Sequence, residues 1–225
     1  MCDSYGAAFR VPRPVRFPIV RALGFDRVLL VDSRPTSNTA GGLVYSMGGE
    51  LIATLHIGDG VQDVVVLDDL IAVTYFDEGV FSGIRPSEQG IAFFEHDGHL
   101  FDGYQAMFGS EAVDIADCYA ACRISGQSLA FVAYTGFPLV RLNPRKRHQE
   151  VVEVPEELHG PSALSVNGQH ACFFGPYSRK RSLFSWAPGS DPKEVGSHSG
   201  SLRGISQHRF LSSGEHGYTV VSWAG

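Results

Sequence analysis

Four acidic residues in two short strings could perform chemistry. Asp59 and Asp63 belong to the string GDGVQDV, and Asp77 and Glu78 follow the next apolar run. Carboxylate oxygens could bind a cation, and a pair of carboxylates could serve as acid and base in glycoside cleavage. The string has fewer oxygen ligands than a calcium-binding loop, and turn aspartates commonly accept backbone N–H bonds. The local pattern therefore favours a structural role over ligand recognition, and ligand recognition over catalysis.

Aromatic residues follow predicted strands in the same parts of the sequence. Phe76 and Phe81 flank the acidic pair of the second string, and Tyr134 and Phe137 follow a later strand. Aromatic rings beside polar groups are typical of surfaces that bind sugars or peptides. Packing between neighbouring sheets is the alternative, and the sequence favours neither.

Two further groups contain the residue types of nucleophilic catalysis. Cys118 lies between Asp117 and Tyr119, and Ser212-Ser213 precede an acid and a histidine. An activated cysteine needs a histidine or a positive environment, whereas a neighbouring carboxylate raises the thiol pKa. The serines lack the surroundings of a nucleophile elbow. We therefore interpret Cys118 as a core thiol and the serines as an ordinary strand end.

The elements that must position these residues form a repeat. A unit of apolar strand, tight polar turn and second apolar strand occurs at residues 17–34, 62–79, 117–136, 161–177 and 202–217. Two strands cannot bury both of their faces alone, so the recurrence implies that the units stack. Each of the first four units has room for four strands. We predict an all-β protein with one domain, residues 1–225, which forms a single five-bladed β-propeller.

The fifth unit predicts how the ring closes. It supplies three strands, at residues 202–206, 209–213 and 218–223, and lacks an outer one. Residues 6–11 (GAAFRV) precede the first unit and have no partner there. We predict that they pair with residues 218–223, because closure of the ring removes an exposed sheet edge. This arrangement resembles the terminal strand exchange of WD-type and tachylectin-like propellers, although the WD dipeptide is absent.

Four local strings carry a second resemblance: GDGVQDV, YFDEGVFSG, DCYA and FPLV, at residues 58–64, 75–83, 117–120 and 137–140. They resemble signatures of an uncharacterised bacterial family of small propeller-like proteins. The resemblance implies a bacterial origin and the fold, and it implies no reaction.

The propeller fold predicts where the functional residues gather. Loops that follow second strands and loops that precede first strands emerge on one face, around the mouth of the central channel. These loops hold the most varied side chains of the repeats, whereas the opposite turns hold generic hairpin residues, which indicates one working face. The predicted ligand- or partner-binding residues are Arg34, Asp59, Asp63, Asp77, Glu78, Asp117, Tyr134 and Tyr177. Arg34 is the expected counter-charge for the carboxylates.

Charge and cysteine usage restrict the partners and the compartment. The formal net charge of −6 and two short basic runs argue against a nucleic-acid partner. The N-terminus lacks a signal-peptide pattern, and no run of about 20 apolar residues predicts a membrane span. The four cysteines show neither a zinc spacing nor a CxxC pair. We expect a cytoplasmic protein without a metal, cofactor or membrane partner.

Two functions of different classes stay open. The first is a non-enzymatic binding module that holds a protein partner or a small ligand on the loop-rich channel face; a bacterial immunity or antitoxin-like protein is its specific version. The alternative is a glycosidase-like hydrolase with carboxylates at the channel mouth. The oligomeric state is left open, since outer strand edges permit dimerisation.

Overall fold

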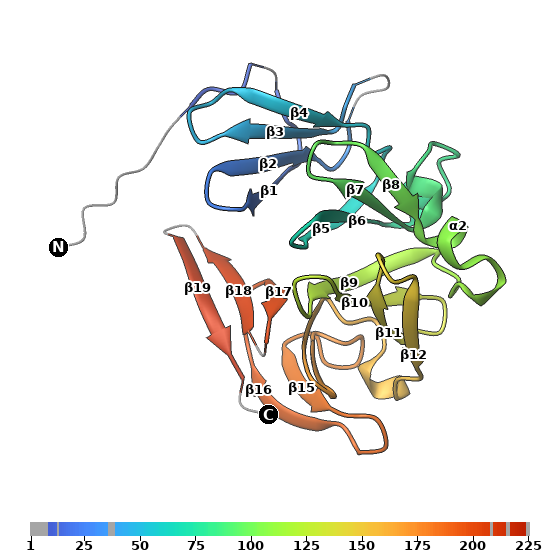
Figure 1. Ribbon diagram of the computed structural model, residues 1–225. Helices are drawn as coiled ribbons and strands as arrows, with labels where there is room; N and C mark the ends of the chain where they lie inside the picture. The colour runs from blue at the N-terminus through green and yellow to red at the C-terminus, as the bar shows by residue number, and fades with distance from the viewer. Residues whose placement is uncertain (1–8, 13, 36–38, 208, 215–216, 224–225) are drawn as a thin grey trace.

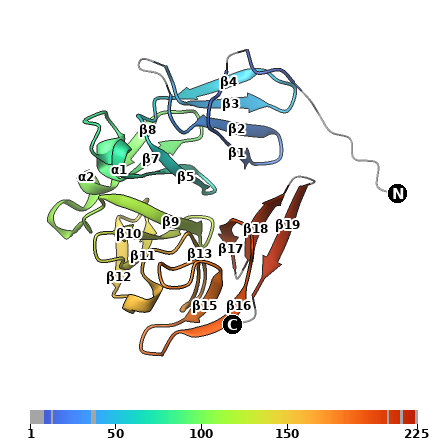
Figure 2. The same ribbon diagram turned by 180° about the vertical axis from the view of Figure 1, so that it is seen from behind.

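The computed structural model describes residues 9–12, 14–35, 39–207, 209–214 and 217–223. Five antiparallel sheets stand around a common centre, in chain order, as the five blades of a propeller (Figures 1 and 2). The predicted all-β fold with five blades is confirmed.

The first two blades have four strands each. Blade 1 consists of β1 (Pro18–Leu23), β2 (Arg27–Asp32), β3 (Gly42–Ser46) and β4 (Leu51–Leu55). Blade 2 consists of β5 (Val61–Val66), β6 (Leu70–Tyr75), β7 (Ile91–Glu95) and β8 (Leu100–Gly103). Short helices lie in the loop between β6 and β7 and after β8, where the sequence predicted none. They are α1 (Asp77–Val80), η1 (Ser87–Gln89), α2 (Tyr104–Phe108) and η2 (Gly109–Glu111).

The remaining blades follow the same plan. Blade 3 consists of β9 (Asp117–Arg123), β10 (Leu129–Tyr134), β11 (Leu139–Asn143) and β12 (His148–Val152), and the 3₁₀ turn η3 (Glu156–Leu158) follows it. Blade 4 consists of β13 (Ala163–Asn167), β14 (His170–Phe174), β15 (Ser182–Trp186) and β16 (Lys193–Ser197). Blade 5 has three strands in the described residues: β17 (Leu202–Ser206), β18 (Arg209–Gly214) and β19 (Gly217–Ser222).

The first strand of each blade is innermost, and the core lies between blades. Successive innermost strands pack against one another from β1 through β5, β9 and β13 to β17. Apolar side chains alternate along the inner strands and meet those of the next blade, as the period of a strand requires. Buried clusters fill the boundaries between blades 1 and 2, 2 and 3, 3 and 4, and 4 and 5.

The boundary between blade 5 and blade 1, which we call the seam, differs from the other four. Among the described residues, no buried apolar cluster joins these two blades. Val20 on β1 is 55% exposed, and Tyr218 and Val220 on β19 are 76% and 53% exposed. In the described residues, blades 1 to 5 are therefore joined in sequence, with little apolar packing across the seam.

The predicted closure by residues 6–11 is wrong for the part that the structure describes. Phe9 lies against Tyr45 of β3, with 5.2 Å between the ring centroids, and Val11 packs on the same cluster of blade 1. In the described residues, β19 pairs with β18 alone. The apolar side chains of Phe9 and Val11 cover apolar surface on blade 1, which draws this segment away from β19. Residues 6–8 lie outside the described residues.

Candidate functional site

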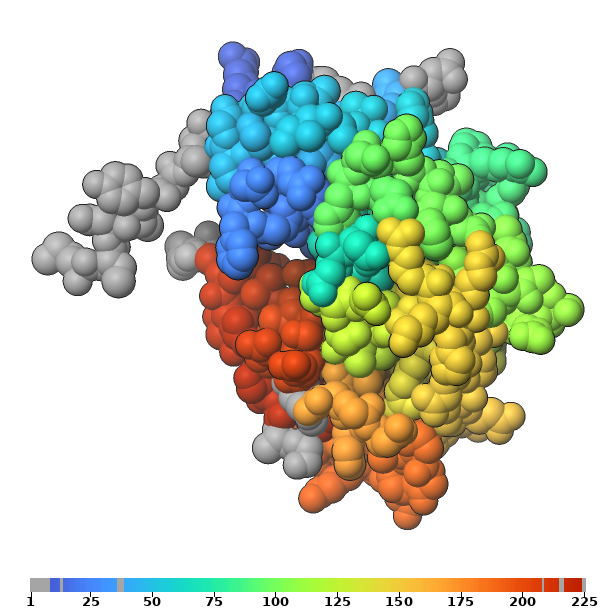
Figure 3. Space-filling view, viewed as in Figure 1, coloured from blue at the N-terminus to red at the C-terminus, as the bar shows by residue number. Residues whose placement is uncertain are grey.

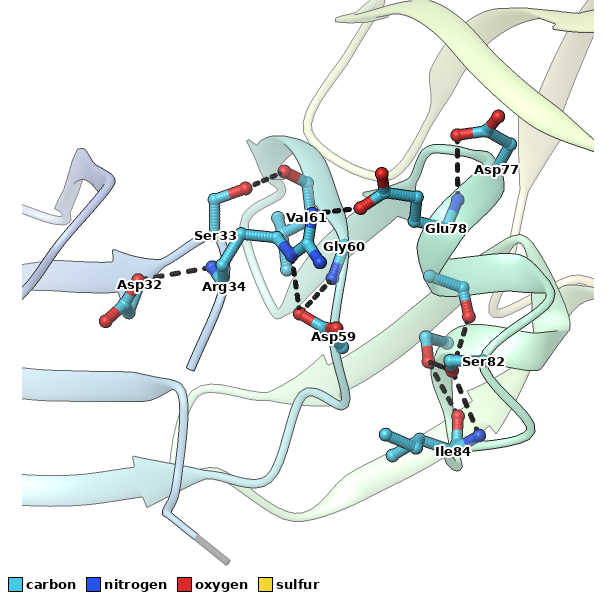
Figure 4. A network of polar contacts seen from close by, with 12 residues as sticks. Asp32, Ser33, Arg34, Asp59, Gly60, Val61, Asp77, Glu78, Ser82 and Ile84 are labelled. Carbon is cyan, nitrogen blue, oxygen red and sulfur yellow. Dashed lines mark hydrogen bonds and ion pairs between the residues drawn. The ribbon is translucent and has the colours of Figure 1, made fainter. Parts of the chain in front are cut away.

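Arg34 connects blade 1 to blade 2 at one end of the ring. Its Nε donates to Asp59 Oδ1 at 3.1 Å, and its Nη1 forms an ion pair with Glu78 Oε2 (Figure 4). The guanidinium also lies over the Phe76 ring, 5.5 Å from its centroid. Burial lowers the pKa of Arg34, but the two carboxylates outweigh that effect and raise it. The structure thus places Arg34 as the internal counter-charge for two of the predicted carboxylates.

Two glycines allow these carboxylates to meet. Gly60 has φ +67°, and a Cβ there would lie 2.4 Å from the amide nitrogen of Gly79 in α1. A Cβ on Gly79 would in turn lie 2.3 Å from the carbonyl oxygen of Asp59. The backbone conformation of Gly60 favours glycine, and at both positions a side chain would overlap the facing backbone. The strings GDG and DEG therefore bring the loop before β5 against α1, which sets Asp59 beside Glu78.

Asp77 and Asp117 form the next acidic group around the ring. Asp77 begins α1 and accepts the amide N–H of Glu78 at 2.7 Å. Asp117 begins β9, and α1 lies next to this strand. Burial, and after it the charge of Asp77, raises the pKa of Asp117 from 3.8 to about 6. One of these carboxyl groups therefore holds a proton more readily than an ordinary aspartate.

An aromatic cluster continues the rim at blades 3 and 4. Phe137 is its buried centre, and its ring centroid lies 4.9–5.6 Å from those of Tyr119, Tyr134, His159 and Tyr177. The hydroxyls of Tyr119 and Tyr177 hydrogen-bond to each other. Tyr134 and Tyr177 remain 46% and 50% exposed. Phe137 has φ +53°, a costly conformation for a side chain of this size, and packing from every side holds it there.

The acidic and aromatic parts of the rim are contiguous. Asp117 on β9 pairs directly with Tyr134 on β10. Tyr119 stands two residues along β9 from Asp117, at an irregularity in the pairing of β9 with β10. The pKa of Tyr119 is raised first by its hydrogen bond to Tyr177 and, less strongly, by the charge of Asp117, so the two side chains are near neighbours. Seven of the predicted site residues occupy this rim, which we define as the following set: Arg34, Asp59, Asp77, Glu78, Asp117, Tyr134 and Tyr177.

The eighth predicted residue, Asp63, belongs to the channel wall. It lies on β5, where its carboxylate forms an ion pair with Arg21 of β1 and accepts the amide N–H of Val64 at 2.6 Å. It lines a central cavity of about 620 Å³ that also contacts Tyr119 and Arg203. Sequence reasoning missed Tyr119 and the two arginines as site residues because they lie within predicted strands. Polar residues that alternate with apolar ones on the innermost strands could have indicated side chains that line the channel.

The described residues include no group of three or more histidine, cysteine, aspartate and glutamate side chains that could hold a metal ion. Cys118, Cys122 and Cys172 are buried free thiols. In the part of the chain that the structure covers, no helix is long and apolar enough to cross a membrane.

Comparison with known proteins shows the fold and no family. No family model matches the chain, and neither does any curated protein. Among solved structures, the chain is similar to a chain of "Streptogramin B lyase structure", with a TM-score of 0.60 and 12% identity over 96% of this chain and 68% of that one. It is also similar to a chain of "Crystal structure of Nidogen/Laminin Complex", with a TM-score of 0.53 and 10% identity over 88% and 72%. Both are propeller proteins. At these identities the likeness shows the fold alone, and the likeness of the four local strings to a bacterial family stays a prediction.

Proposed function

We propose that this chain is a non-enzymatic binding module that holds a protein partner on the rim. The observation that carries the proposal is the exposure of Tyr134 and Tyr177 directly beside a group of carboxylates on one face. Exposed tyrosines supply large contact area at a low entropic cost. Arg34 neutralises only part of the rim charge, so the complementary partner segment carries lysine or arginine, which pairs with the carboxylates and stacks on the rings.

A bacterial immunity or antitoxin-like protein is the specific version of this function. It requires a partner-binding face rather than catalytic groups, and the partner would be a toxin with a basic segment. The three buried free thiols suit a reducing, cytoplasmic setting. A small cationic ligand at the same rim would use the same contacts.

The test is a charge-neutral double variant, Asp77→Asn with Glu78→Gln. The matched control, Asp26→Asn with Asp97→Asn, removes two carboxylates from hairpin turns on the opposite face. A partner captured from cells is then titrated against each variant by calorimetry. We expect the rim variant to lose at least about tenfold in affinity, since charge pairs at interfaces couple by about 1.5 kcal/mol or more. Equal affinities for the rim variant, the control and the unmodified chain would contradict the proposal.

A glycosidase-like hydrolase is the second candidate, and the pKa of Asp117 is the observation that favours it. A carboxyl group with a pKa of about 6 beside a second carboxylate is a suitable general acid. Removal of that acid, Asp117→Asn, would lower turnover of an activated aryl glycoside by about 10²–10⁴-fold. A chain without activity on such substrates, whose partner binding survives Asp117→Asn, is the binding module.

A further inference from the structure

Two cavities meet at the centre of the ring. The rim-side cavity of about 620 Å³ and a second cavity of about 570 Å³ share Arg21, Arg203 and Gly204 among their walls. The second cavity opens on the face of the hairpin turns, opposite the rim. Figure 3 shows this face, which is hollowed between blade 1 in blue and blade 5 in red. The two guanidiniums therefore stand in the middle of the channel.

Arg21 is fully engaged by the protein. Its Nε donates to the carbonyl of Val64 and its Nη1 to that of Val20, each at 2.8 Å, and its Nη2 pairs with Asp63. The Asp63 carboxylate is the acidic group of the rim-side cavity. Once Arg21 holds it, little of its charge remains for a second cation.

Arg203 has no such engagement. Within the described part of the chain, its guanidinium forms no hydrogen bond, and no carboxylate lies within 4.0 Å of it. It is half-buried. Burial first, and then the charge of Arg21, lowers the pKa of Arg203, and the attraction of Asp63 does not compensate. The centre of the channel thus carries net positive charge in a chain whose formal charge is −6.

The packing of β17 fixes Arg203 in this position. Leu202 is buried in the cluster between blades 4 and 5. A Cβ on Gly204 would lie 1.6 Å from the carbonyl oxygen of Leu164, so β17 lies directly against β13 there. Because side chains alternate along a strand, Arg203 points away from its two packed neighbours and into the channel. An arginine held where burial disfavours its charge is a mark of a functional site.

Basic side chains also line the second mouth. Arg27, Arg123 and His96 line it together with the two channel arginines, and Asp68 is its one acidic lining residue. Asp68 is paired with Arg123, and Arg27 is paired with Asp26 at 3.5 Å. Among the described guanidiniums of this cavity, the one without a carboxylate partner is therefore that of Arg203, and the cavity walls concentrate its field on an anion that enters.

We propose that the channel binds a small molecule with a phosphate group, which enters through the hairpin-turn mouth and pairs with Arg203. A phosphate dianion can accept two parallel N–H bonds from the guanidinium of Arg203, because the planar fork of an arginine matches its oxygens. A cavity of about 570 Å³ is of ordinary size for a small-molecule site. This site is independent of the partner-binding rim.

The test titrates the whole chain with inorganic phosphate and with phenyl phosphate, by calorimetry, at constant ionic strength set with chloride. The variants are Arg203→Gln and Arg203→Lys. The control, Arg181→Gln, makes the same change of charge at an exposed position outside both cavities. We expect saturable binding that falls at least about tenfold in Arg203→Gln, falls less in Arg203→Lys, and is unchanged in the control.

Stability without phosphate separates a binding role from a structural one. Arg203→Gln removes a desolvated, unpaired cation, so its thermal midpoint in chloride buffer is expected to equal or exceed that of the unmodified chain. A lower midpoint would assign Arg203 to the fold and overturn the proposal. Equal phosphate affinity in Arg203→Gln and the unmodified chain would overturn it too, as would the absence of saturable binding below about 10 mM of either probe.

Discussion

Replacement of Asp117 by asparagine is expected to stabilise the protein at neutral pH and to leave it unchanged in acid. In the folded chain the pKa of Asp117 is raised from 3.8 to about 6, first by burial and then by Asp77. The folded state therefore binds this proton more tightly than the unfolded state does. Stability falls as pH rises from about 3.8 to about 6, and the full penalty persists above that range.

The size of the effect follows from the two pKa values. A pKa unit corresponds to about 1.36 kcal/mol, so the penalty has an upper value of about 3 kcal/mol. Asp117 is only half-buried, and solvent screening reduces the expected gain to about 1–2 kcal/mol. Asparagine has the shape of aspartate without its charge, so the variant removes the penalty and little else.

Urea unfolding at several pH values from 3.5 to 8 provides the measurement. The difference between Asp117→Asn and the unmodified chain is expected to be near zero at the acid end, to grow through pH 4–6, and then to level off. Other groups titrate equally in both proteins and cancel from the difference. In Asp77→Asn, the pKa of Asp117 should fall partway towards 3.8, as carboxyl NMR would show. A constant difference across this range, with Asp117 titrating near 4, would refute the coupling of the two rim carboxylates.

Three other predictions concern the rim, the core and the thiols. In urea unfolding, a double-mutant cycle of Arg34→Gln and Glu78→Gln should give a coupling free energy below about 1 kcal/mol, because the two side chains are 39% and 58% exposed. A larger coupling would mean that this ion pair stabilises the fold. Gly204→Ala should cost about 3 kcal/mol or more in urea unfolding, since its Cβ would overlap the Leu164 carbonyl, whereas Gly214→Ala meets only an ordinary 3.9 Å contact and should cost less than about 1 kcal/mol. Burial blocks access to Cys118, Cys122 and Cys172 and raises the pKa of each thiol, that of Cys122 to about 12. In a Cys2→Ser background, a bulky maleimide should therefore label these thiols only as fast as the chain unfolds. Rapid labelling of the folded protein would contradict this expectation.

The sequence was sufficient to predict the blades because the strands of each blade are consecutive in the chain. Hairpin turns such as Asp68-Asp69 and Asn167-Gly168 stand between apolar strands, and the spacing of these units predicts the number of blades. Closure was predicted wrongly because the N-terminal segment could pack either against β19 or against blade 1, and these two surfaces are far apart in the sequence. The sequence indicates that the apolar side chains of Phe9 and Val11 will be buried. It does not indicate that they pack against Tyr45 of blade 1.

The positions of the candidate residues were predictable to the extent that topology decides them, whereas their role in binding stays a prediction. Seven residues lie on the rim because ends of second strands and starts of first strands share one end of a propeller. Asp63 instead lies in the channel wall, since β5 begins at Val61, two residues before it. The unpaired positive charge of Arg203 within the channel could not be foreseen, because it results from the lack of a free carboxylate near it in the described part of the chain, and that is a property of packing rather than of sequence order.

Every described sheet consists of strands that are consecutive in the chain. The consequence is mechanical. Pulled from its two ends, a propeller whose first and last blades share a strand must shear that strand before anything else yields. In the part of the chain that the structure describes, the terminal blades share no strand, so tension on β19 would break its hydrogen bonds to β18 one pair after another. Blade 5 and the blades behind it would give way in succession, each as a separate unit of nearest-neighbour contacts.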